Sequence, residues 1–218
     1  MSTTDIKELR AELLNEQIRH ERIKADLAAL ELASATDTER DRQVKGGKLR
    51  LLNINDVIVG KKAELWLDAL QHWERRDPGE PVQVTINSPG GSVTDGLAIY
   101  DTLMRMRRNG HRVITHGQGL VASMASVLLQ AGDERVMDER AKLMIHEGSI
   151  HTSGESRMSR GDREDMEQFM AMLDKDLVTI LAERSTLSER QLRNRWKRKD
   201  WWLTAEEALK LGFVDRVE

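Results

Sequence analysis

The spacing of apolar residues predicts a long N-terminal helix, followed by alternating strands and helices. Over residues 5 to about 33, apolar side chains recur every three or four positions and form one stripe. Glu16 and His20 interrupt this stripe. Two interpretations stay open: the helix pairs with a helix of another chain, or it docks on its own domain. The stripe consists of Ile6, Leu9, Leu13, Ile23, Leu27 and Leu30.

A polar segment separates this helix from the rest of the chain. Residues 34–48 (SATDTERDRQVKGGK) are almost all polar and end next to Gly46 and Gly47, a composition typical of linkers. We therefore predict two domains. Residues 1–47 form the N-terminal helix and linker, and residues 48–218 form the main domain.

Short strand patterns and longer helical patterns alternate through the main domain. This alternation predicts an α/β fold with a largely parallel sheet. In the last helix, Thr204 is the expected N-cap, Glu207 stands at the capping-box position, and Gly212 ends the helix. Strands are predicted at 49–53, 56–60, 82–87, 112–116 and 142–146, and helices at 63–76, 94–109, 123–130, 163–183, 187–198 and 204–211.

Composition excludes several classes of protein. With 34 Lys and Arg against 37 Asp and Glu, the net charge is −3, which argues against coating by nucleic acid. The absence of cysteine excludes disulfides, thiolate metal sites and a cysteine nucleophile. The least polar run, residues 119–132, is shorter than the roughly 20 residues of a membrane span, and no secretory signal is visible. We expect a cytoplasmic protein with no membrane partner.

Six cations between residues 190 and 199 precede Trp201 and Trp202. Such a cluster can bind nucleic acid, or it can be a solvated helix face that pairs with acidic neighbours in this chain or another subunit. The slightly acidic chain favours the second interpretation, so no nucleic-acid partner is expected.

Residues 88–92 (SPGGS) lie between a predicted strand and a predicted helix. Gly90 and Gly91 allow backbone N–H groups to face a ligand without a Cβ in the way, as in half of an oxyanion hole. The alternative is an ordinary strand–helix turn. Neither phosphate-binding pattern, GxGxxG or GxxxxGK[ST], is present.

Ser123 and His146 are the candidate catalytic side chains. Ser123 stands between small residues at the start of a helix, where it is either an exposed nucleophile or a plain N-cap. His146 ends a buried strand, a suitable place for a general base or for a hydrogen-bonded core histidine. His116 and His151 are rival bases.

Read together and in order, these segments resemble the ClpP-type serine peptidases. The resemblance runs from about residue 49 to residue 217. It is carried by INSPGG at 86–91, IYDT at 99–102, GLVASM at 119–124, MIH at 144–146, DWWLTAEEA at 200–208 and GFVD at 212–215.

The resemblance implies a ClpP/crotonase-like stack of strand–strand–helix turns. A protruding handle would be formed by residues 148–159 and the long helix that follows. Ser123 would be the nucleophile, His146 the general base and Asp200 the residue that orients the imidazole. The rivals for the third role are Asp162, Asp165, Asp174 and Asp176.

The resemblance also implies how substrate binds. The backbone N–H groups of Gly91 and Met124 would form the oxyanion hole. A peptide or protein substrate would lie extended along two segments, and no metal or cofactor is expected. The substrate-binding residues would be Ser92, Val93, Gly148 and Ser149.

This sequence departs from the family pattern at positions that affect which partners we expect. Glu147 and Gly148 replace the usual Gln-Pro, and the N-terminal hairpin that docks ATPase unfoldases is not recognisable. A homo-oligomer, as a ring or stacked rings, is still implied. An ATPase unfoldase is one candidate partner. Capsid proteins are another, by analogy with phage-type relatives that mature viral capsids. The alternative functions are a crotonase-like acyl-CoA enzyme and a catalytically idle assembly module.

Overall fold

The computed structural model describes residues 49–148, 159–197 and 199–218. The predicted N-terminal helix and linker lie outside the described residues. So does the segment 149–158, which holds Ser149, His151 and most of the predicted handle strand. The domain boundary near residue 48 stays a prediction.

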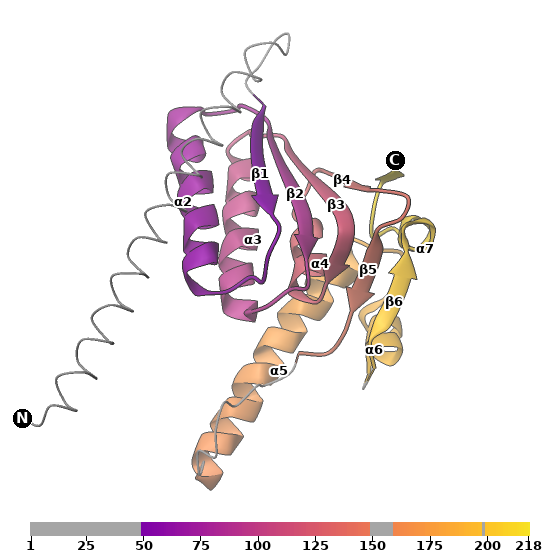
Figure 1. Ribbon diagram of the computed structural model, residues 1–218. Coiled ribbons are helices and arrows are strands. Elements are labelled where there is room, and N and C mark those ends of the chain that lie inside the picture. The colour runs from indigo at the N-terminus through magenta and orange to yellow at the C-terminus, as the bar shows by residue number, and fades with distance from the viewer. Residues whose placement is uncertain (1–48, 149–158, 198) are drawn as a thin grey trace, which may run out of the picture. The chain divides into compact units, whose positions relative to one another are not determined.

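Strands and helices alternate along the described chain, as the sequence predicts (Figure 1). The strands are β1 (Arg50–Ile54), β2 (Val82–Ser88), β3 (Val113–Ala122), β4 (Glu134–Met137), β5 (Lys142–Ile145), β6 (Trp201–Thr204) and β7 (Arg216–Val217). The helices are α2 (Gly60–Arg76), α3 (Val93–Arg108), α4 (Met124–Leu129), α5 (Arg160–Glu183), α6 (Glu189–Trp196) and α7 (Ala205–Lys210).

These strands form one largely parallel sheet, which confirms the predicted fold class. Its main path runs β1-β2-β3-β4-β7, with every pair parallel. The ten-residue strand β3 has two neighbours on the same side: its first half pairs with β4 and its second half with β5. Strand β6 pairs with β5 alone, and this pair is antiparallel. The sheet therefore divides at β3 into two arms.

A bulge lets β3 change neighbours halfway along its length. The register between β2 and β3 shifts between Ile86 and Ser88. Gly119 takes φ +55° there, a conformation that suits glycine, and Asn87 Oδ1 accepts a hydrogen bond from Leu120 N at 3.1 Å. The end of β3 is thereby directed towards β5.

Two groups of helices pack on the strands. In Figure 1, α2 and α3 run side by side along β1 and β2, and α4 packs against α3 and β3. The long helix α5 contacts α4 and α6 with its C-terminal half, where Leu177, Val178 and Leu181 are buried. Its N-terminal half extends beyond the sheet, as the handle prediction requires, and carries the exposed Phe169; Met172, near the middle of the helix, is exposed as well.

The predicted strand at 56–60 is wrong. Ile58 makes only an isolated parallel bridge to Gly91, and Gly60 already begins α2. The Asp95 carboxylate accepts a hydrogen bond from Gly60 N at 2.9 Å and so satisfies one of the free N–H groups at the start of that helix. The short strands β4, β6 and β7 were not predicted.

Arg135 on β4 is a buried cation that fastens the C-terminal segment to the sheet. It is 6% exposed, and its Nη2 and Nε donate to the two carboxylate oxygens of Asp215 at 2.5 and 3.0 Å. Burial acts to raise the pKa of Asp215, but the hydrogen bonds from Arg135 outweigh it and hold that pKa below its usual value. Nη1 donates to Gln130 Oε1 and to the carbonyl oxygens of Arg184, Gly212 and Phe213.

We expect Arg135→Met to lower the free energy of unfolding by at least about 2 kcal/mol, because several buried acceptors lose their donor. This decrease in the free energy of unfolding stays below that for a fully buried ion pair, since the Asp215 side chain is 41% exposed. The matched control is Arg112→Met, because Arg112 is 66% exposed and pairs with Glu134 at the surface. This control should cost no more than about 1 kcal/mol. Urea unfolding of both variants measures the difference, and equal losses would contradict this role of Arg135.

Candidate active site

Ser123 occupies a sharp turn between β3 and α4. Its φ of +54° and ψ of −126° make it the one non-glycine residue with positive φ in the described part of the chain. Ser123 N donates to Met144 O at 2.8 Å, while Ser126 N and Oγ donate to Ser123 O at 2.9 and 2.6 Å. Strand β5 on one side and helix α4 on the other therefore hold a strained backbone that exposes the hydroxyl group.

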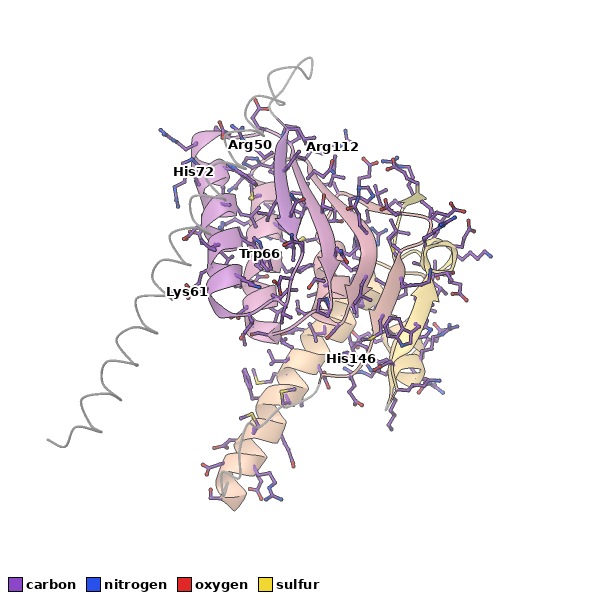
Figure 2. The ribbon with its side chains drawn as sticks, viewed as in Figure 1. Arg50, Lys61, Trp66, His72, Arg112 and His146 are labelled. Carbon is purple, nitrogen blue, oxygen red and sulfur yellow. The ribbon has the colours of Figure 1, made fainter. Side chains whose placement is uncertain are left out.

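The Ser123 side chain points to His146 and does not cap the helix. No cap hydrogen bond from this side chain is present at the start of α4, whereas its Oγ lies 2.7 Å from His146 Nε2. His146 directly follows β5, near α5 (Figure 2), and β5 pairs with β3 through Met144 and Ala122. The strand register thus sets the distance between the hydroxyl and the imidazole.

Asp200 lies on the other side of the same imidazole. It directly precedes β6, and the antiparallel partner of Trp201 in that strand is Ile145 of β5. Asp200 Oδ1 is 3.3 Å from His146 Nδ1, an ion-pair distance. Because Nε2 faces the serine hydroxyl, the proton of a neutral imidazole belongs on Nδ1, where the carboxylate accepts it.

The rival residues have other partners. His116 Nε2 lies 2.7 Å from Asp138 Oδ1, and Asp162 takes part in the capping box that begins α5. Asp174 accepts a hydrogen bond from Gly148 N at 3.3 Å, and burial is the main cause that raises its pKa. Asp165 and Asp176 are exposed on α5. Of the described candidates, the structure brings Ser123, His146 and Asp200 together.

The Gly90–Gly91 loop lies directly against the Ser123 turn. A Cβ built on Gly90 would be 2.6 Å from Ala122 O and 2.7 Å from Ser123 Cβ, so no larger residue fits there. Ile58 occupies one edge of the loop: Ile58 N donates to Gly90 O at 2.8 Å, and Ser92 N donates to Ile58 O at 2.7 Å.

Two backbone N–H groups lie in the segments beside Ser123. Among the described residues, the N–H groups of Gly91 and Met124 have no hydrogen-bond acceptor. Met124 is the first residue of α4, where a helix leaves its N–H groups unpaired. Gly91 belongs to the loop after β2, and Met124 follows the turn at the end of β3. These two segments touch at Gly90. The arrangement can stabilise an oxyanion that forms on a carbonyl group attacked by Ser123.

Of the four predicted substrate-binding residues, Val93 and Gly148 lie at this site, while Ser92 is engaged at the start of α3. Ser92 is the N-cap of α3 and accepts a hydrogen bond from Asp95 N at 3.3 Å. Val93 and Gly148 line a pocket that also contains Ser123 and His146. Ser149 lies outside the described residues.

Within the described ranges, no three histidine or carboxylate side chains are grouped so as to hold a metal ion. No helix in these ranges is both long and apolar enough to cross a membrane.

Comparison with known proteins finds one family along the chain. The family model for Clp protease matches residues 16–218. The ATP-dependent Clp protease proteolytic subunit of Bacteroides fragilis is 36% identical over 157 residues, covering 70% of this chain and 68% of the relative. The subunit of the same name from Porphyromonas gingivalis is 35% identical, covering 77% and 73%. The ATP-dependent Clp protease proteolytic subunit 3 of a Synechococcus strain is 34% identical, covering 78% and 83%.

Gly96 of α3 is a residue of the site that the sequence did not identify. A Cβ on Gly96 would lie 2.2 Å from Met124 Cγ, so the absence of a side chain leaves the space that the Met124 side chain fills. No sequence signal marks this role, because a glycine inside a helix is visible only as an unfavourable residue.

We expect Gly96→Ala to lower kcat/KM for a peptide about 10- to 100-fold, because the displaced Met124 carries its N–H group away from the oxyanion. Complete loss of one such donor costs about 10²–10³-fold. Met124→Ala in the same chain removes the clash and should restore part of the activity.

The matched control is Gly161→Ala on α5, where a Cβ meets only Ser159 Oγ at 3.8 Å. This variant should keep the parent activity. A double variant no more active than Gly96→Ala would show that the glycine does not act through Met124.

Proposed function

This chain belongs to the Clp protease family of serine-type peptidases, and we propose that it hydrolyses peptide bonds through an acyl-enzyme formed on Ser123. The observation that carries the proposal is the 2.7 Å contact between Ser123 Oγ and His146 Nε2, next to two backbone donors with no acceptor among the described residues. A nucleophile, a base, an orienting carboxylate and an oxyanion hole are the parts that acyl transfer requires.

The first half of the reaction forms the acyl-enzyme. Ser123 Oγ attacks the carbonyl carbon of the peptide bond while its proton passes to His146 Nε2. The carbonyl oxygen becomes an oxyanion and accepts hydrogen bonds from Gly91 N and Met124 N. Asp200 stabilises the imidazolium through Nδ1–H. When the C–N bond breaks, the leaving amine takes the proton from Nε2.

Water completes the cycle. His146 Nε2, now neutral, accepts a proton from a water molecule that attacks the acyl carbon, and the same two N–H groups stabilise the second oxyanion. Collapse of this intermediate returns the proton to Ser123 Oγ and releases the carboxylic acid. No cofactor takes part in these steps.

The substrate would lie extended along Ser92 and Val93 on one side and along the segment that begins at Gly148 on the other, bound by main-chain hydrogen bonds. Its side chain just before the cleaved bond, P1, enters the pocket beside Ser123. No charged residue belongs to the lining of that pocket among the described residues. The proposed substrates are therefore unfolded peptides with an apolar P1 residue.

We further propose that copies of the chain assemble into a ring or stacked rings. Helix α5 exposes Phe169 (45%) and Met172 (60%), apolar surface that a second copy would cover. The relatives are named ATP-dependent, which favours an ATPase unfoldase as partner, and capsid maturation is the alternative role. A light-scattering mass several times the 24.9 kDa of one chain supports assembly, and a monomer contradicts it.

The alternative functions differ from the proposed one in whether they need the contact between Ser123 Oγ and His146 Nε2. A crotonase-like acyl-CoA enzyme would also use two backbone N–H groups, but it has no need for a serine hydroxyl held by an imidazole and a carboxylate. An idle assembly module would keep the fold without turnover.

We expect Ser123→Ala to lower peptide hydrolysis by at least about 10⁴-fold with the fold intact, because Ser123 Oγ is the one hydroxyl group at His146 Nε2 among the described residues. The assay is cleavage of a fluorogenic peptide at fixed protein concentration, with circular dichroism as the check on folding.

The control is Ser188→Ala, which removes the N-cap of α6 but no atom of the site. It should stay within a few-fold of the parent. Full activity of Ser123→Ala would show that Ser123 is not the nucleophile. A parent protein without peptidase activity would favour the idle assembly module.

A further inference from the structure

The carboxylate of the proposed triad stands at the end of a strand. Asp200 directly precedes β6, which runs beside β5 in Figure 1, and the last residue pair of this ladder is Ile145 with Trp201. The Asp200 side chain is 55% exposed, and within the described residues its one ion-pair partner is His146, at 3.3 Å. Chain segments fray first at their ends. The position of the Asp200 carboxylate therefore depends on what holds Trp201.

The Trp201 side chain is held from two sides. Its ring packs edge-to-face with Phe213, at a centroid distance of 5.9 Å and an interplanar angle of 73°. Phe213 is 0% exposed and belongs to the hydrophobic core, so it is a rigid support. The guanidinium carbon of Arg195, on α6, lies 5.1 Å from the centroid of the Trp201 ring, within the range of a cation–π interaction.

This contact gives one of the cations that precede the tryptophans a role inside the chain. Arg195 lies in the last turn of α6, and Leu192 and Trp196 anchor that helix to the core, with exposed fractions of 0% and 2%. The helix therefore holds Arg195 over the Trp201 ring. Trp202, the next residue of β6, is 51% exposed, because successive side chains of a strand point to opposite faces.

We propose that Trp201, held between Phe213 and Arg195, is a positioning residue that keeps Asp200 at His146 Nδ1. This inference rests on the proposed peptidase function of the same site. It adds a residue that acts on the reaction without touching the substrate, since Trp201 does not belong to the described lining of the pocket beside Ser123. Loss of the indole frees the end of β6, and the carboxylate then no longer orients the imidazole.

The first test measures kcat and KM of the full-length chain on a fluorogenic peptide. Trp201→Ala should lower kcat about 10- to 100-fold, which is less than the roughly 10⁴-fold cost of losing the orienting carboxylate itself. KM should stay within about twofold, because the pocket lining is unchanged. Trp201→Phe keeps a ring between Phe213 and Arg195, so its kcat should stay within about threefold of the parent. Arg195→Ala removes only the cation and should lower kcat about two- to fivefold.

The matched controls are Trp202→Ala and Arg190→Ala. Trp202 is the neighbouring tryptophan on the same strand, and Arg190 is an exposed cation at the other end of α6. Both variants should keep the parent kcat. Circular dichroism and light scattering check that the fold and the assembly of each variant match those of the parent.

The second test asks whether Trp201 acts through Asp200. The labelling rate of Ser123 by a fluorophosphonate is measured in the parent, in Trp201→Ala, in Asp200→Asn and in the double variant. Trp201→Ala should slow labelling in the parent but change it by no more than about twofold in the Asp200→Asn background, where no carboxylate is left to position. If Trp201→Ala does not fold, Trp201→Leu replaces it, because leucine keeps apolar contact with Phe213 and offers no ring to Arg195.

Three results would overturn the proposal. They are slowing by the same factor with and without Asp200, a KM that rises while kcat is unchanged, and a Trp202→Ala variant that loses as much activity as Trp201→Ala. Failure of the proposed function looks different: the parent then cleaves no peptide, and Ser123 does not react with the fluorophosphonate.

Discussion

The site depends on a close contact between two loops at the same edge of the sheet. Because β2 and β3 are parallel neighbours, the loop after β2 and the turn after β3 emerge side by side. Gly90 meets Ala122 and Ser123 with no room for a Cβ, and Ile58 closes the other edge of the loop. This packing brings the segment that holds Gly91 next to the segment that holds Met124. A side chain at Gly90 would push these two segments apart, because its Cβ would clash with Ala122 O, Ser123 Cβ and Met124 N.

The strand pairing that carries the other two residues is equally direct. His146 follows β5, which is in register with the end of β3, and Asp200 precedes β6, which is in register with β5. The imidazole therefore stands between its two partners because of backbone hydrogen bonds. This arrangement of the imidazole depends on the bulge at Gly119, because the bulge turns the second half of β3 away from β4 and towards β5.

Local sequence patterns predicted the parts of the structure that local forces determine. The main helices, the parallel strands β1, β2 and β3, and the Thr204 capping box are visible as periodicity or as capping residues, and the ordered motifs pointed to Ser123, His146 and Asp200. The strands β4, β6 and β7 were missed, although β5, with four residues, is as short as β4 and β6 and was predicted. Pairing with strands distant in the sequence defines the three missed strands. Gly96 lies against Met124, a residue distant in the sequence, so no pattern along the chain could reveal this contact.

The central claim is that His146, held at the edge of the sheet, activates the hydroxyl group of Ser123. Reaction with a fluorophosphonate probe, followed by mass spectrometry of the digested protein, tests this most directly. The account predicts one modified residue, Ser123, and a labelling rate that falls by orders of magnitude in His146→Ala. Labelling at another serine, or equal labelling of Ser123 with and without His146, would contradict it.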